Sequence, residues 1–323
     1  MDNKTQSIIR RLIPGLIFGF LVFLVIILMG DLRQVATQVY EFQWKYYPLV
    51  LLLTLFNYLL RFFKWHFYLG LVGVEKFPLL QSAQLFLAGF PLAVTPGKVG
   101  EALKAVWLQK QTGVPTSRGI SVVLAERISD GLGVLILSTL GVIAYPQFWP
   151  AFAFVLGGLI ILILVIQIRP AALWLLNLGT KLPLIKRFSE GLKEFYEGSY
   201  SLFRPKAILV AVSIGTISWL GEGIGMYLIL VGLGVTAGWG TLSIAVFVLA
   251  FSTVIGAVTA LPGGLGAAEA SIAGMLTLLL ALSRDTAAAA TILIRFATLW
   301  FAVLLGLIVW LFSRKLLFSE TGD

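Results

Sequence analysis

The sequence predicts an all-α polytopic membrane protein, with about six full spans and two broken helical hairpins arranged as an inverted repeat. Of its 323 residues, 59% are hydrophobic and 12% are charged, whereas a soluble domain carries roughly 25% charged residues. The apolar residues form runs near the roughly 20 residues that a helix needs to cross a bilayer. Helices suit a bilayer because they satisfy their own backbone hydrogen bonds. We therefore expect a single membrane domain over residues 1–323.

The composition also excludes several classes of function. The chain has no cysteine and a single histidine, His66, which argues against thiol catalysis, iron–sulfur clusters and zinc centres. Gly97 and Lys98 do not form a nucleotide-binding loop, because Val99 stands where such a loop needs serine or threonine. The net charge of +9 is typical of basic loops that face anionic lipid. We expect no enzymatic activity, cofactor, metal or nucleic-acid partner.

Six apolar runs are expected to be full spans. The first follows Lys4, Arg10 and Arg11 and lacks the small-residue cleavage site of a signal peptide, so we expect it to be retained as a helix. Each run reaches the length needed to cross the membrane. The six runs lie at about residues 12–29, 47–68, 118–144, 150–168, 207–233 and 286–312.

Proline and glycine interrupt two further apolar runs. The interruptions are TPGKVGE at residues 95–101 and LPGGLG at residues 261–266. Such residues break helices, and a break at membrane depth is tolerated only inside protein or beside a water-filled cavity. The sequence therefore predicts two hairpins, 79–111 and 241–282, that enter and leave on one side of the membrane.

This arrangement divides the basic residues between the two sides of the membrane. With six spans and two re-entrant hairpins, both termini fall in the cytoplasm. The external segments then hold only Arg33, Lys45 and Arg284, as the positive-inside rule requires. The cytoplasmic segments hold Lys4, Arg10, Arg11, Lys76, Lys110, Arg118, Arg314, Lys315 and seven basic residues between Arg169 and Lys206.

The two hairpins belong to a predicted internal repeat. Each break has a Pro-Gly-x-x-Gly core followed by a glutamate, and 26 residues separate that glutamate from an arginine in both halves. Each half contains a span, a hairpin and a span, at residues 47–144 and 207–313, with residues 145–206 connecting them. The halves begin on opposite faces of the membrane. Inverted repeats with discontinuous helices are typical of transporters that bind substrate near the bilayer midplane.

The connection between the halves mixes basic residues with apolar ones over residues 171–203. One interpretation is that it forms one or two cytoplasmic helices that lie on the membrane surface, where basic residues meet anionic headgroups. A solvated linker helix would explain the same pattern equally well.

Ionisable residues within the apolar runs are the main functional candidates, because charge in hydrocarbon is expensive. The repeat pairs Glu101 with Arg127 and Glu269 with Arg295. Arg61 and Lys64 share a face near one end of their span, where we expect them to act as positive-inside anchors. The full set is Arg61, Lys64, Lys98, Lys104, Arg127 and Arg295 with Glu101, Glu126, Asp130, Glu222 and Glu269.

We expect these residues to bind an anionic group such as a phosphodiester. The helices that follow the breaks would present backbone N–H groups and a positive helix end inside the membrane. Structural roles compete with this interpretation: Glu101 and Glu269 suit the first turn of a helix, and Arg127 is placed to pair locally with Asp130. The predicted substrate-binding residues are Lys98, Gly100, Glu101, Arg127, Asp130, Glu222, Gly263, Gly264, Gly266, Glu269 and Arg295.

At these motifs the sequence resembles the transmembrane region of the lysylphosphatidylglycerol synthase/flippase family. The resemblance rests on TPGKVGE at 95–101 followed by AERISD at 125–130, and on LPGGLGAAE at 261–269 followed by Arg295. It covers residues from about 10 to 315. It implies a multi-pass protein of a prokaryotic inner membrane that moves amphipathic, phosphate-bearing lipids between leaflets.

The family resemblance also bears on activity and partners. Members that transfer aminoacyl groups carry a separate soluble synthase domain, which the sequence lacks, so we expect a stand-alone flippase. The implied ligand is an anionic or aminoacylated phospholipid, or a polyprenyl- or hopanoid-type lipid. A separate lipid-modifying synthase and a second copy of the chain are the protein partners we consider. The alternatives are an ion-coupled transporter of a small anionic solute, and a non-catalytic scaffold for such a synthase.

Overall fold

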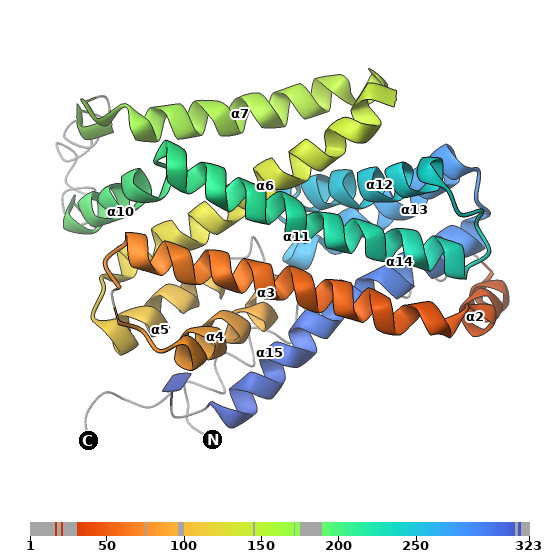
Figure 1. The fold of residues 1–323 in the computed structure, drawn as a ribbon, viewed down its shortest axis with the longest axis horizontal. Coiled ribbons are helices and arrows are strands. Elements are labelled where there is room, and N and C mark those ends of the chain that lie inside the picture. Colours follow the sequence, from red (N-terminus) through yellow and green to blue (C-terminus); the bar gives the residue numbers. More distant parts are fainter. Residues whose placement is uncertain are drawn as a thin grey trace.

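The described part of the chain is entirely helical. The computed structural model describes residues 17, 21, 31–74, 76–95, 100–144, 146–170, 172–174, 189–313 and 316–317, and these include no strand (Figure 1). The all-α class expected from the sequence is therefore confirmed. The expected first span at residues 12–29 lies outside the described residues apart from Ile17 and Leu21.

Four of the other five expected spans coincide with apolar helices of membrane length, whereas the fifth, residues 118–144, forms a long helix that is not among them. Within the described residues, six helical stretches are long and apolar enough to cross a membrane: Trp44–Leu71, Trp149–Gln167, Pro205–Gly232, Trp239–Val258, Pro262–Leu280 and Arg284–Phe312. The helices in chain order are α2 (Leu32–Glu41), α3 (Tyr47–Leu71), α4 (Leu79–Ala88), α5 (Leu103–Thr112), α6 (Thr116–Ala144), α7 (Trp149–Gln167), α10 (Ser189–Leu202), α11 (Pro205–Gly232), α12 (Trp239–Val258), α13 (Ala267–Leu280), α14 (Arg284–Arg295) and α15 (Phe301–Phe312), with short helical turns η1 (Trp44–Tyr46), η2 (Phe90–Val94), η4 (Pro146–Phe148), η5 (Pro262–Gly264) and η6 (Phe296–Trp300).

The two hairpins differ in the length of their arms. The arms of the first hairpin are the apolar helical stretch Leu79–Val94, formed by α4 and η2, and α5 with 10 residues, and both are shorter than the roughly 20 residues that a spanning helix needs. In the second hairpin, α12 has 20 residues and the stretch Pro262–Leu280 has 19, so both arms are long enough to cross. The first hairpin therefore has the short arms that a re-entrant segment requires, and the second does not. The inverted relation between the halves stays a prediction.

The broken ends of the two hairpins meet in the interior. A Cβ atom placed on Gly263 in η5 would lie 3.4 Å from Val94 Cγ1 in η2. Gly264 adopts φ +68° and packs so closely on α12 that a Cβ atom there would lie 3.0 Å from Gly256 Cα. Glycine is needed at this contact because it tolerates positive φ and leaves room for the neighbouring backbone. The breaks therefore bring both hairpins to one place.

Helix α11 lies between α3, α6 and α12 and brings its central segment into the interior. A Cβ atom on Gly133 of α6 would lie 2.7 Å from the backbone nitrogen of Thr216, and one on Gly223 would lie 2.9 Å from Val246 Cγ2 of α12. Figure 1 shows α3 and α11 running side by side. The glycines near Glu222 thus allow close packing of α11 against its neighbours.

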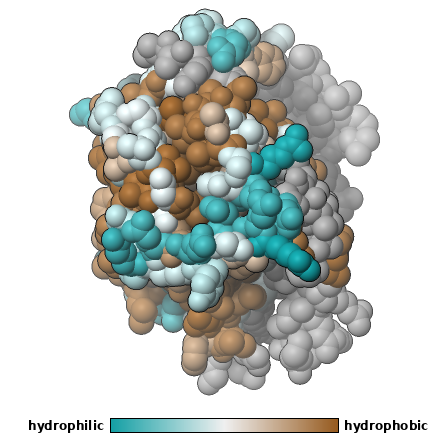
Figure 2. Space-filling model, turned by 90° about the vertical axis from the view of Figure 1, so that its right-hand side faces the viewer, coloured by the Kyte–Doolittle hydropathy of each residue, from teal (hydrophilic) through white to brown (hydrophobic). Residues whose placement is uncertain are grey.

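The loops collect at two ends of the bundle, as the charge pattern predicts. At one end, Asp31 donates its backbone N–H to Asp285 at 2.9 Å, and Gln43 donates to Gly232 at 3.0 Å. Figure 2 looks at this end, where a hydrophilic patch adjoins an apolar surface. At the other end, Arg118 pairs with Glu194 at 2.5 Å. Arg33, Lys45 and Arg284, which were expected outside, therefore lie at the opposite end of the bundle from Arg118, which was expected inside.

The connection between the halves includes a helix packed on the bundle. Helix α10 buries Tyr196, Gly198, Ser199 and Leu202, and a Cβ atom on Gly198 would lie 2.3 Å from Ser121 Oγ of α6. The residues of α10 are thus held against α6. The alternative of a solvated linker helix is therefore wrong for this part of the connection. The remainder of that segment, residue 171 and residues 175–188, lies outside the described residues.

Candidate functional site

A cavity of about 370 Å³ lies between the two broken hairpins. Residues of both hairpins line it, together with residues of α3, α6, α7, α11 and α14. Its charged and polar lining residues are Tyr58, Arg61, Glu101, Lys104, Arg127, Asp130, Trp219, Glu222, Thr253, Arg295 and Thr298, and its aliphatic ones include Val134, Val155, Leu159, Leu249, Val254 and Val258. Gly263 and Gly264 also line it.

The second predicted ion pair is present at the end of η5. Arg295 Nε lies 2.5 Å from Glu269 Oε1, and Arg295 Nη2 donates to the carbonyl of Gly263 at 3.1 Å. The other oxygen of Glu269 accepts the backbone N–H of Gly266 at 2.7 Å. Glu269 is fully buried and therefore both caps α13 and fixes Arg295 beside the break. Arg295 lines the cavity, whereas Glu269 supports it from behind.

The first predicted ion pair is also present, in a looser form. Arg127 Nε lies 3.5 Å from Glu101 Oε2, and Arg127 Nη2 lies 3.7 Å from Asp130 Oδ2. The local pairing with Asp130 is therefore confirmed as well. The Arg127 side chain is 30% exposed, whereas that of Arg295 is 13% exposed. Arg127 is therefore the more available of the two arginines for a ligand.

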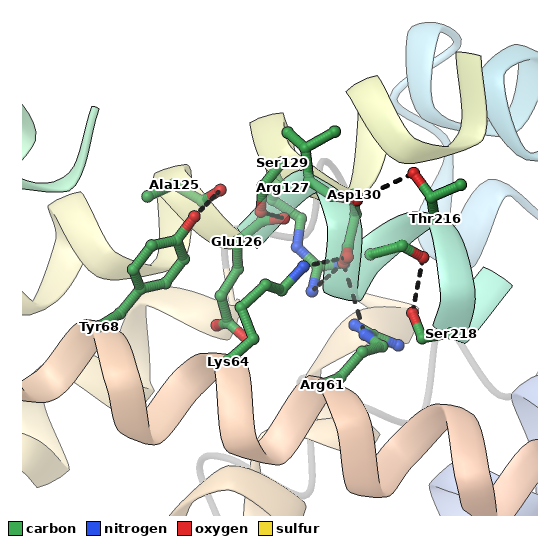
Figure 3. Close-up of polar contacts among 12 residues, drawn as sticks. Arg61, Lys64, Tyr68, Ala125, Glu126, Arg127, Ser129, Asp130, Thr216 and Ser218 are labelled. Carbon is green, nitrogen blue, oxygen red and sulfur yellow. Dashed lines mark hydrogen bonds and ion pairs between the residues drawn. The ribbon is translucent and has the colours of Figure 1, made fainter. Parts of the chain in front are cut away.

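Asp130 joins α6 to two basic residues of α3 (Figure 3). Its carboxylate forms an ion pair with Lys64 Nζ, and Arg61 Nε lies 3.4 Å from its other oxygen. The Lys64 side chain is fully buried and that of Arg61 is 12% exposed. The expected role of Arg61 and Lys64 as interfacial anchors is thus wrong, because α3 turns this face towards α6 and α11.

Lys104 and Glu126 form a further buried pair between α5 and α6. Their charged atoms lie 2.8 Å apart, and Lys104 Nζ lies 4.7 Å from the centre of the Trp65 ring. Lys104 lines the cavity but was not among the predicted binding residues, nor was Arg61. A sequence signal existed for Arg61, since it shares a helical face with Asn57 and Lys64, a run of polar residues that is typical of an inward face.

Glu222 stands apart from these pairs. It is 5% exposed and lines the cavity from α11, yet within the described part of the chain no basic group lies within 4.0 Å of its carboxylate. Nearby polar groups also lack partners: the indole N–H of Trp219 and the side-chain amide of Asn57 are buried without a hydrogen bond to any described residue. The α3–α11 side of the site therefore holds buried polar groups without hydrogen-bond partners among the described residues.

Three of the four predicted glycines, Gly100, Gly264 and Gly266, use their backbone N–H groups in hydrogen bonds within the chain. Gly100 donates its N–H to Thr95 Oγ1 at 2.9 Å, and Gly266 donates to Glu269. The arginine side chains are therefore the more accessible donors in the described site. Lys98, the remaining predicted residue, lies outside the described residues. The described residues include no group of three or more His, Asp or Glu that could hold a metal ion.

Comparison with known proteins agrees with this architecture. A family described as lysylphosphatidylglycerol synthase TM region matches residues 16–306. The chain is also 27% identical, over 281 residues, to a protein of Methanothermobacter thermautotrophicus named "UPF0104 membrane protein", with 79% of each chain covered. No solved structure matches the chain at a significant level. With its six membrane-length helices, its paired Glu–Arg motifs and this match over most of its length, the chain is a multi-pass membrane protein that belongs to the family of lysylphosphatidylglycerol synthase transmembrane regions.

Proposed function

We propose that the chain moves a phosphate-bearing amphipathic lipid between the leaflets of the cytoplasmic membrane. The composition of the cavity carries this proposal: α3, α5, α6, α11 and α14 contribute charged side chains or carry them at their ends, and the walls from α7 and α12 are uncharged. Charged groups suit a headgroup, and apolar surface suits the first part of an acyl chain. A free anion would use only the first of these features.

Helix α7 supports entry of the lipid from the side. Val155 and Leu159 of α7 line the cavity, and only 6% of the α7 span is buried, against 22–44% in the other membrane-length helices. Among the described elements, α7 alone therefore lies between the cavity and the outside of the bundle on this side. A lipid would keep its tails in the bilayer while its headgroup occupies the cavity.

Arg127 is the residue that we assign to the phosphate. Its two ion pairs are long, at 3.5 and 3.7 Å, and its side chain is the most exposed among the paired cations of the cavity. It therefore keeps donors that a phosphate could occupy, and guanidinium groups bind phosphate in a bidentate manner. Arg295 is committed to Glu269 and Gly263 and would contact the ligand only with its remaining N–H groups.

The direct test is lipid movement in vesicles that contain the purified full chain. Fluorescent phosphatidylglycerol would be placed in one leaflet and its arrival in the other followed by chemical quenching. We expect Arg127→Ala to slow this movement by about tenfold or more, since one charge-assisted contact contributes roughly 1.5–3 kcal/mol. Arg33→Ala, which removes an exposed arginine of α2, should leave the rate unchanged.

The same vesicles distinguish lipid transport from the transport of a small anionic solute. The second candidate function, transport of a solute, is one that the unpaired Glu222 also favours. Radiolabelled inorganic phosphate would be offered outside the vesicles and its uptake measured. Lipid movement that exceeds that of protein-free vesicles supports the proposal. Uptake of phosphate without lipid movement would overturn it in favour of a solute transporter.

A further inference from the structure

Glu222 is a buried carboxylate whose charge no described residue neutralises directly. Its side chain lines the cavity and is 5% exposed. By contrast, Glu101, Glu126, Asp130 and Glu269 each lie within 4.0 Å of a basic group. A lone carboxylate is expensive to keep ionised in a membrane interior. A carboxylate at this position is therefore suited to a function in which it gains and loses a proton.

The groups that face Glu222 from the neighbouring helices include both signs. Arg61 and Tyr58 act on it from α3, Asp130 from α6 and Arg295 from α14, and the residues that α12 contributes to the same cavity are all uncharged, with Thr253 the only one that has a polar side chain. Each of the two arginines already has a carboxylate partner. They therefore attract the Glu222 charge from a distance without neutralising it.

The charges of the described residues around the cavity balance only when Glu222 is ionised. The described cations are Arg61, Lys64, Lys104, Arg127 and Arg295, and the described carboxylates are Glu101, Glu126, Asp130, Glu222 and Glu269. Addition of one proton to Glu222 leaves these groups with one surplus positive charge. That surplus favours an anion in the cavity, and loss of the proton disfavours it.

We propose that Glu222 is the proton site that couples binding of a phosphate group in the cavity to uptake of one proton. A proton from the aqueous phase adds to a carboxylate oxygen of Glu222 as the phosphate binds at Arg127, and the same proton returns to water as the phosphate leaves. This inference rests on the proposed function only for the source of the phosphate, which is a lipid headgroup.

The surroundings of Glu222 favour a proton over a lipid amine as its partner. Arg61 and Arg295 line the same cavity and oppose any added positive charge, whether a proton or an ammonium group, so the space beside Glu222 decides between the two. A side chain that is 5% exposed leaves little surface for a bulky cation. A proton needs neither space nor a second contact surface.

The test measures binding of fluorescent phosphatidylglycerol to the purified full chain from about pH 5.5 to about pH 8.5, a range in which free phosphatidylglycerol keeps its charge. We expect wild-type affinity to rise by about tenfold towards the acidic end, because a carboxylate and a phosphate in one cavity repel each other. Glu222→Gln is neutral at every pH, so its affinity should stay at the acidic wild-type level. Glu222→Asp should keep the slope, and Glu41→Gln, an exposed change on α2, should match the wild type.

Each outcome separates this inference from the proposed function. An equal slope in wild type and Glu222→Gln, or no slope in either, would overturn the proton site while leaving lipid binding intact. Binding of inorganic phosphate with the expected slopes, and no binding of phosphatidylglycerol, would support the proton site and overturn the lipid. As a second readout, an imposed gradient of phosphatidylglycerol should move protons into vesicles with the wild-type chain and not with Glu222→Gln.

Discussion

Asp130 holds two basic residues of α3 inside the bundle, and the stability of the charged cluster depends on it. We expect Asp130→Asn to lower the free energy of unfolding by about 3–5 kcal/mol, because the change leaves the fully buried Lys64 without a counter-ion. Chemical denaturation in detergent would measure this loss. Glu197→Gln, which removes an exposed partner of Arg169, should cost about 0–1 kcal/mol. Equal losses in the two variants would contradict the role of Asp130.

The two Glu–Arg pairs of the predicted repeat differ in strength. Arg295 and Glu269 lie 2.5 Å apart and are nearly buried, whereas Arg127 and Glu101 lie 3.5 Å apart with Arg127 partly exposed. Double-mutant cycles to alanine should give a coupling energy of about 2–3 kcal/mol for the first pair and about 1 kcal/mol or less for the second. A larger coupling for Glu101 and Arg127 would show that Arg127 is held as tightly as Arg295 and is not free for a ligand.

The sequence predicted the ion pairs that follow the spacing of its internal repeat. It did not predict the ion pairs between helices that the repeat does not relate. The equal Glu-to-Arg separation predicted both repeat pairs, and both are present. The contact between Lys104 and Glu126 has no such spacing. Arg61 and Lys64 were misplaced because a basic residue near a helix end suits an interface or an interior equally well. Only the packing of α3 against α6 and α11 decides between them.

At the scale of elements, the break between α12 and α13 depends on glycine. We expect Gly264→Ala to lower the free energy of unfolding by about 1–3 kcal/mol, because its φ of +68° disfavours other residues and its Cβ atom would press on Gly256. Gly274→Ala is the matched control, since Gly274 is exposed in α13 with nothing within 4 Å of its Cβ position. It should be neutral or stabilise slightly. Thermal unfolding of both variants would test this, and a tolerated Gly264→Ala would contradict the assigned packing.

The helical elements were largely predictable because each depends on local features. Apolar runs located α3, α6, α7, α11 and the α14–α15 span, and Pro-Gly motifs located both breaks. Arm lengths were less predictable. The apolar run before the second break forms a helix of membrane length, α12, although the motif was the same as in the shorter first hairpin. The packing of α10 on α6 depends on a contact between Gly198 and Ser121. The sequence of neither helix indicates this contact by itself.

At the scale of the whole molecule, α7 lines the cavity on one face and is largely exposed on the other. If acyl chains pass along this helix, Val155→Trp should slow the movement of fluorescent phosphatidylglycerol by about tenfold, because the larger side chain fills apolar space that the lipid needs. Phe154→Trp is the matched control, since Phe154 is 81% exposed on the adjacent position. Equal rates for Val155→Trp and wild type in the vesicle assay would contradict passage along α7.

The central claim is that the cavity between the hairpins holds the headgroup of a phosphate-bearing lipid. Mass spectrometry of the lipids that co-purify with the full chain tests it most directly. Bulk membrane and the Arg127→Ala variant would serve as references, with Arg33→Ala as the matched control. Our account predicts that wild type and Arg33→Ala enrich one class of phosphate-bearing lipid and that Arg127→Ala loses it. The same bulk lipid composition in all three proteins would contradict the account.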